Sequence, residues 1–92
     1  MLSNKKNLPM SNFTTEKLDR IWEKGEVVRG KNQNLYRKDD LGNTIYRPSY
    51  GKCTPMGWEV DHSKPISKGG TDHLNNLRPL QTNANRSKGD KY

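Results

Sequence analysis

The chain of 92 residues contains a single cysteine, Cys53. One thiol cannot form an intramolecular disulfide, and it cannot supply the cysteine pairs from which many structural zinc sites are built. A disulfide-stapled domain and a cysteine-built zinc module are therefore both excluded. We assign Cys53 no role, because a lone cysteine usually behaves as a small apolar residue.

Hydrophobic residues are also scarce, at 28% of the sequence. No apolar run approaches the roughly eighteen residues of a membrane-spanning helix, and the N-terminus lacks the apolar region of a signal peptide. We therefore expect no membrane association and a cytoplasmic location, although a toxin exported without a signal peptide would look the same. Two Trp and four Tyr favour one small folded domain over disorder. Its core must be thin, so a bound metal or partner would add to its stability.

Basic residues are abundant, in contrast. Lysine and arginine outnumber acidic residues by 17 to 10, which gives a formal net charge of +7. They are spread along the whole chain rather than gathered in one tail. Such a balance favours a polyanionic partner, of which nucleic acid is the commonest, over a soluble domain that is merely basic.

The N-terminal half predicts a helix followed by a hairpin. Residues 1–12 are polar, and we expect them to be mobile. Residues 13–25 predict a short helix with Thr14 as its N-cap and Gly25 as its stop, covering the core. Its narrow apolar face is formed by residues at positions i, i+3 and i+4, namely Leu18, Ile21 and Trp22.

Residues 26–34 have the composition of a charged connector, and residues 35–47 predict two short strands around a turn at 39–43. Each arm of this hairpin carries a tyrosine followed by an arginine. Aromatic residues beside cations suit a nucleic-acid-binding face, but they suit an ordinary half-buried hairpin equally well. Both interpretations stay open.

The C-terminal part predicts a strand, a long loop, a second strand and a helix. Residues 57–61 alternate as a strand does, and residues 63–74 contain the proline and paired glycines of a loop. Leu77 and Leu80 bracket a short return strand. Residues 81–88 are poor helix formers, so their helix must depend on tertiary contacts. The expected fold class is α+β.

Asp61 and His62 stand side by side at the end of the first of these strands. Cleaving a phosphodiester requires a deprotonated water, neutralised phosphoryl oxygens and a stabilised leaving alkoxide. A divalent cation can supply the last two, and an imidazole, whose ordinary pKa is about 6.5, can supply the first. The oxygens of Asp61 and Asn85 suit Mg²⁺ or Mn²⁺ better than zinc.

Each of these residues also has a plain structural interpretation. A histidine beside an aspartate is most often a solvated surface group, and we leave His73 as structural or surface. Asn76 and Asn85, taken singly, are ordinary turn and cap residues. Their combination, order and spacing are what favour a site.

Geometry sets two conditions for such a site. Neighbours on a regular strand point to opposite faces, so the strand should end or distort at Asp61 and His62. On the helix, Asn85 and Lys88 lie at i, i+3 and share a face, so they can approach the same phosphate. Arg86 is expected to point elsewhere, toward a flanking phosphate.

The combination resembles the HNH nuclease family, also described as the ββα-metal or His-Me finger fold, in its small bacterial and phage members. The match covers about the last thirty-five residues. It is carried by Val60-Asp61-His62, Pro65, Gly69-Gly70-Thr71-Asp72, Asn76-Leu77, Leu80 and Asn85-Arg86-Ser87-Lys88-Gly89-Asp90.

The resemblance implies that His62 is the general base and that Asp61 and Asn85 bind the catalytic metal. It also implies that Asn76 holds the loop and orients His62. The whole chain, residues 1–92, would be one nuclease domain, with residues 57–90 as its catalytic ββα-metal unit.

The sequence departs from many relatives at the places of two zinc-binding cysteines, where it has Gln81 and Ala84. We therefore expect no structural zinc. The third family position, often histidine, is Asn85 here, a variation that keeps metal binding plausible.

The sequence thus predicts a metal-dependent DNA endonuclease that uses one Mg²⁺ or Mn²⁺. The alternatives are a nucleic-acid-binding module of the same fold that does not cut, and the nuclease domain of a bacterial toxin. The candidates for contacts with DNA phosphates are Lys64, Lys68, Arg78, Arg86 and Lys88.

Overall fold

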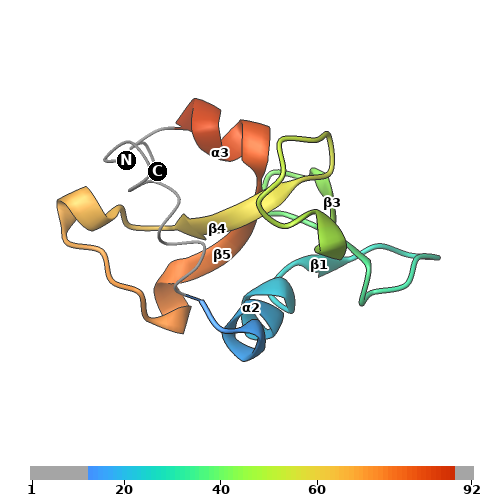
Figure 1. The fold of residues 1–92 in the computed structure, drawn as a ribbon, viewed down its shortest axis with the longest axis horizontal. Helices are drawn as coiled ribbons and strands as arrows, with labels where there is room; N and C mark the ends of the chain where they lie inside the picture. Colours follow the sequence, from blue (N-terminus) through green and yellow to red (C-terminus); the bar gives the residue numbers. More distant parts are fainter. Residues whose placement is uncertain (1–12, 89–92) are drawn as a thin grey trace.

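The computed structural model describes residues 13–88, so the expected mobility of residues 1–12 concerns a segment outside the described residues. The described part is a small α+β fold with two α-helices and two antiparallel sheets (Figure 1). In chain order its helices and strands are α2 (Thr15–Trp22), β1 (Glu26–Val27), β2 (Tyr36–Lys38), β3 (Thr44–Tyr46), β4 (Trp58–His62), β5 (Leu77–Gln81) and α3 (Thr82–Lys88).

Helix α2 begins as the sequence predicts, because the Thr14 side chain accepts a hydrogen bond from the Lys17 backbone N–H at 3.1 Å. Gly25 follows the helix but does not take the left-handed conformation of a helix-ending glycine. A Cβ at this position would lie 3.0 Å from the Cβ of Arg37 and 3.2 Å from the Lys38 carbonyl oxygen. A side chain at Gly25 would therefore crowd β2, whose neighbouring atoms would have to shift by a few tenths of an ångström.

The predicted hairpin is confirmed, with β2 and β3 paired so that Arg37 lies opposite Ile45. The prediction that residues 26–34 are only a connector is wrong at its start, because Glu26 and Val27 form β1 and pair with β2. Two residues carry too little periodicity to be recognised as a strand.

Arg37 has a structural role in this sheet. It is buried, and its guanidinium donates to the carbonyl oxygens of Gln33 at 3.0 Å, Glu23 at 3.1 Å and Gly25 at 3.0 Å. These bonds fasten the end of α2 to β2. For Arg37, the structure favours the ordinary half-buried hairpin over a nucleic-acid-binding face.

Asp39 ties the hairpin turn to the C-terminal unit. It is only 3% exposed. Its Oδ1 accepts from the backbone N–H groups of Leu41 at 3.0 Å and Asn43 at 2.8 Å, and its Oδ2 accepts from the Gln81 N–H at 2.9 Å. Since Gln81 is the last residue of β5, this carboxylate fixes where α3 begins.

Replacing Asp39 with Ala is expected to lower the free energy of unfolding by about 2–3 kcal/mol, because three partly buried N–H groups lose their acceptor. Urea denaturation measures this change. The matched control is Asp40→Ala, since Asp40 forms a more exposed ion pair with Arg78 and its loss should cost less than about 1 kcal/mol. Equal losses in the two variants would contradict the assigned role.

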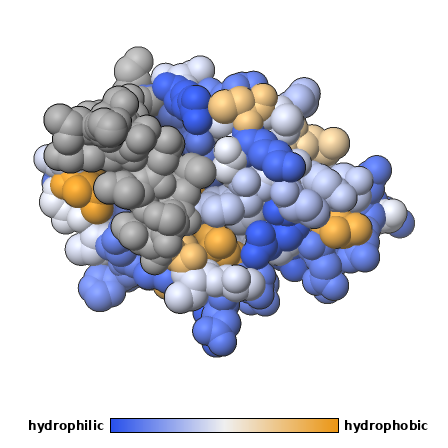
Figure 2. Space-filling view, viewed as in Figure 1, coloured by the Kyte–Doolittle hydropathy of each residue, from blue (hydrophilic) through white to orange (hydrophobic). Residues whose placement is uncertain are grey.

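The core lies between α2 and the β4–β5 sheet. Trp58 is fully buried, and its ring centroid is 5.1 Å from that of Trp22 on α2. The buried cluster consists of Phe13, Leu18, Ile21, Trp22, Ile45, Trp58 and Leu77. Figure 2 shows a mainly hydrophilic face on which hydrophobic side chains form separate spots. No helix within residues 13–88 is long and apolar enough to cross a membrane.

The β4–β5 sheet lies between the two helices, with α2 on one side and α3 on the other (Figure 1). Its antiparallel register places Asp61 opposite Arg78 and His62 opposite Leu77. Strand β4 ends at His62, but its regular pairing with β5 includes both Asp61 and His62. The end or distortion expected at these two residues is therefore not found, and strand alternation directs their side chains to opposite faces of β4. Pro79 is tolerated in β5 because, among the described strands, β5 pairs with β4 alone and has a second edge that joins no strand.

Candidate active site

The two faces of β4 have different partners. Trp58 and Val60 pack in the core, whereas Glu59 and Asp61, the alternate residues, form ion pairs with side chains of α3. This follows from the two-residue period of a strand. The site is therefore built where a carboxylate-bearing face of β4 meets α3.

Asp61 is a buried carboxylate held between two cations. It is 5% exposed, and Arg78 Nε lies 2.7 Å from its Oδ2 while Lys88 Nζ lies 3.1 Å from its Oδ1. Arg78 also contacts Asp40 at 3.1 Å. Burial disfavours the charged guanidinium, but the bonds to Asp61 and Asp40 outweigh it and raise the pKa of Arg78 above its usual range. Both oxygens of Asp61 are thus engaged by cationic side chains.

His62, at the end of β4, is held by the loop. Its Nε2 lies 2.6 Å from Asp72 Oδ1, and the imidazole is mostly buried while the Asp72 side chain is exposed. A carboxylate in this position orients the ring and engages one nitrogen, leaving the other to accept a proton. Sequence reasoning gave Asp72 no role, because nothing in its spacing shows that the loop folds back onto His62.

Asn76 pins the loop in place. Its Oδ1 accepts from the Lys64 N–H at 2.8 Å, and its Nδ2 donates to the carbonyl oxygens of Lys64 at 3.0 Å and Thr71 at 2.8 Å. Its own carbonyl accepts from the Ser63 N–H at 2.9 Å, directly beside His62. This is the geometry of a loop-holding asparagine.

Gly70 allows that loop to close. A Cβ at this position would lie 1.8 Å from the Lys64 carbonyl oxygen, a collision with the backbone that no side-chain movement relieves. The adjacent Gly69 has a φ of 91°, a left-handed conformation that favours glycine. The paired glycines therefore serve the loop that carries Lys64 and Asp72.

Substituting Gly70 with Ala is expected to displace the loop from Asn76 and to lower the free energy of unfolding by at least about 1–3 kcal/mol. Amide hydrogen exchange should show lost protection at Lys64, whose N–H is bonded to Asn76. Ser67→Ala, an exposed change in the same loop, is the control and should have little effect. Retained protection in Gly70→Ala would show that the loop closes without the glycine.

Asn85 and Lys88 share one face of α3, as their spacing predicts, but they contact different acids. Asn85 Nδ2 donates to Glu59 Oε1 at 2.9 Å, while Lys88 reaches Asp61. Asp61 and Asn85, the predicted metal ligands, are thus brought to the same β4–α3 interface without a recorded bond between them. The prediction that Arg86 points elsewhere is wrong, since its long side chain also reaches Glu59, at 3.2 Å.

Glu59 is a buried residue at this interface to which the sequence analysis assigned no role. The signal was present, because Glu59 and Asp61 are two apart on a strand and must share a face. Its hydrogen bond to Arg86, and then its charge, raise the pKa of that guanidinium.

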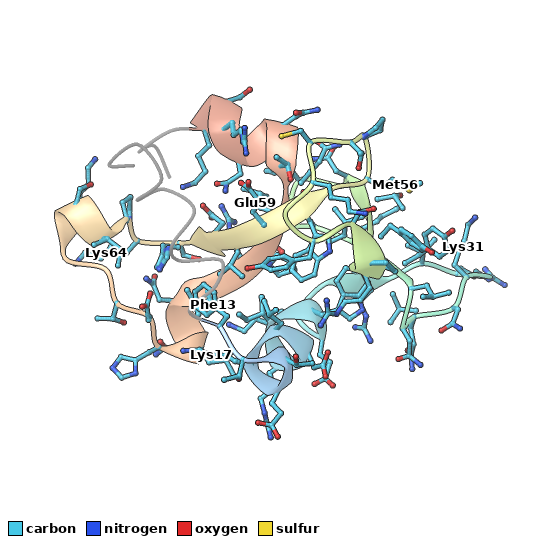
Figure 3. All side chains as sticks on the ribbon, viewed as in Figure 1. Phe13, Lys17, Lys31, Met56, Glu59 and Lys64 are labelled. Carbon is cyan, nitrogen blue, oxygen red and sulfur yellow. The ribbon has the colours of Figure 1, made fainter. Side chains whose placement is uncertain are left out.

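The predicted phosphate contacts divide into two groups. Lys64 and Lys68 are exposed on the loop that follows β4, where Figure 3 labels Lys64. Arg78 and Lys88 instead lie against Asp61, with 23% and 11% of their side chains exposed. Arg86 pairs with Glu59 but remains 58% exposed.

The donor chemistry fits a hard cation. Residues 13–88 contain no cluster of three or more His, Cys, Asp or Glu side chains suited to a metal. The oxygens at the interface come from one carboxylate, Asp61, and one amide, Asn85, backed by Glu59. A site with only a few protein oxygen ligands suits Mg²⁺ or Mn²⁺, because these ions keep several bound waters and also bind the phosphates of the substrate. The same set is a poor match for zinc.

Comparison with known proteins identifies the C-terminal part of the chain. Residues 48–91 match the family model described as HNH endonuclease. Searches of curated proteins and of solved structures found no match. The matched range contains β4, the pinned loop, β5 and α3, which together carry Asp61, His62, Asn76 and Asn85. Residues 48–91 are therefore similar to the HNH endonuclease family.

Proposed function

We propose that the protein is a metal-dependent endonuclease that hydrolyses DNA phosphodiester bonds in the cytoplasm. Residues 57–90 would be its catalytic ββα-metal unit, within a single domain spanning the chain. The observation that carries this proposal is the buried Asp61 carboxylate, which is paired with Arg78 and Lys88 and stands directly before a histidine whose ring is held by Asp72.

Asp61 and Asn85 would hold one Mg²⁺ or Mn²⁺. When bound, that ion would neutralise the phosphoryl oxygens and stabilise the leaving alkoxide. No structural zinc is part of the proposal.

His62 would act as the general base. Its imidazole takes the proton of the attacking water, while Asp72 keeps the ring in place and favours the imidazolium that forms. Asn76 keeps the loop, and with it Asp72, against the end of β4.

The basic side chains would bind the DNA backbone. Lys64 and Lys68 lie on the exposed loop, whereas Arg78, Arg86 and Lys88 line the carboxylate site itself. Contacts of this kind neutralise phosphates without reading bases, so binding should weaken steeply with salt.

Nicking of supercoiled plasmid in Mg²⁺, compared with EDTA, tests the proposal. Relaxed circles or linear DNA should form in Mg²⁺ only. Binding without cleavage, measured by fluorescence anisotropy under the same conditions, would instead identify a nucleic-acid-binding module of the same fold.

Lys88→Met is expected to tighten Mn²⁺ binding several-fold, because it removes a positive charge that lies 3.1 Å from Asp61 Oδ1. It should also weaken DNA binding, and the plot of the logarithm of the DNA-binding constant against the logarithm of salt concentration should become less steep by about one released counterion. Calorimetry and anisotropy at several salt concentrations measure the two effects. Lys64→Met is the control and should change only the DNA binding; equal Mn²⁺ affinities in wild type and Lys88→Met would contradict the expected competition.

A further inference from the structure

Glu59 is a buried acid that the proposed mechanism leaves without a task. It lies on β4 two residues before Asp61, and Figure 3 shows it between β4 and α3. Both of its oxygens are occupied. Oε1 accepts from Asn85 Nδ2 at 2.9 Å, and Oε2 accepts from Arg86 Nη2 at 3.2 Å.

The bond to Asn85 has a directional consequence. An asparagine amide has a donating NH₂ end and an accepting oxygen end, and a carboxylate can only accept. Glu59 therefore engages the NH₂ end of Asn85, and the amide oxygen must face away from Glu59. A hard cation binds an amide only through that oxygen.

We propose that Glu59 is a positioning residue that sets the amide of Asn85 for metal binding. The inference rests on the proposed function, because Glu59 can position a metal ligand only if Asn85 binds the metal. Partners that orient metal ligands typically change metal affinity by about 10–100-fold when they are removed.

Arg86 has a lesser part in this arrangement. Its guanidinium bonds the second oxygen of Glu59, but the side chain is 58% exposed, so the pair is solvent-screened. Removing Arg86 leaves the bond between Glu59 and Asn85 intact. Arg86→Met is therefore a matched control for Glu59→Met, and it should change Mn²⁺ affinity less than about threefold.

Mn²⁺ binding, measured by titration calorimetry without DNA, tests the role of Glu59. Glu59→Met keeps the side-chain length but removes the acceptor, and we expect about 10–100-fold weaker binding. The decisive comparison is with the Asn85→Ala background. If Glu59 acts through Asn85, adding Glu59→Met to Asn85→Ala does not change the Mn²⁺ affinity further. If Glu59 instead binds the ion directly, or acts only through its negative charge, the added substitution weakens Mn²⁺ binding again.

The exchanged pair, Glu59→Gln with Asn85→Asp, provides the second test. In this pair the side chain at position 59 becomes the hydrogen-bond donor and the one at position 85 the acceptor, while one negative charge is kept. Mn²⁺ affinity should therefore return to within a few-fold of wild type. Thermal unfolding in EDTA verifies that each variant is folded.

The outcomes separate the two proposals. Three results would overturn the role of Glu59 while leaving the proposed function standing. The first is a wild-type Mn²⁺ affinity in Glu59→Met, and the second is an equal loss of Mn²⁺ affinity from Glu59→Met in the wild-type and Asn85→Ala backgrounds. The third is weak Mn²⁺ binding in the exchanged pair. A wild-type protein that binds no Mn²⁺, with or without DNA, and does not cut would overturn both.

Discussion

His62→Ala should slow plasmid nicking by about 10²–10⁴-fold while leaving Mn²⁺ binding intact, because it removes the general base but none of the proposed ligand oxygens. The substitution also frees Asp72 from its contact with the ring, but Asp72 is exposed and can be solvated. The substitution should therefore lower the cleavage rate and leave the free energy of unfolding nearly unchanged.

Single-turnover cleavage and calorimetry, performed on the same preparations, measure the two properties. The matched control is His73→Ala, which removes the other histidine, an exposed residue in the same loop. Its cleavage rate should stay close to that of wild type. Full nicking activity in His62→Ala would remove His62 from the mechanism.

Asp61→Asn should weaken Mg²⁺ binding by more than about 100-fold and abolish cleavage, because an amide replaces the only carboxylate proposed as a direct ligand. Asn keeps the volume of the buried side chain beside Arg78 and Lys88. Without metal the variant should also be less stable than wild type, since two partly buried cations lose their partner.

The thermal midpoint in Mg²⁺ and in EDTA gives a readout independent of cleavage. At a metal concentration 100 times the Kd, binding adds about 2.7 kcal/mol to wild-type stability, a shift of roughly 10–20 °C for a domain this small. Asp61→Asn should show almost none of this shift. Asp40→Asn, which removes the other acid on Arg78, should keep it. A normal Mg²⁺ shift in Asp61→Asn would place the metal elsewhere.

The order of the secondary structure could be predicted from the sequence because its signals are local. Thr14 caps α2, alternation marks β4, and the paired glycines at 69 and 70 mark the loop. The exceptions depend on tertiary contacts. Strand β1 has two residues, and the tight fit at Gly25 arises because β2 passes close to it.

The candidate site was predictable as a set of residues but not as a set of contacts. Strand alternation and helix spacing place Asp61, Asn85 and Lys88 at one interface. They do not determine that Lys88 reaches Asp61 while Asn85 reaches Glu59. Those pairings depend on how α3 lies over β4, which distant residues such as Asp39 help to fix.

Anomalous diffraction from crystals soaked in Mn²⁺ tests most directly whether Asp61 and Asn85 form one metal site. We predict one strong peak within about 2.5 Å of both an Asp61 carboxylate oxygen and Asn85 Oδ1, with Asn85 Nδ2 still on Glu59. A peak away from Asp61, or an Asn85 amide that turns its nitrogen toward the ion, would contradict the proposed site.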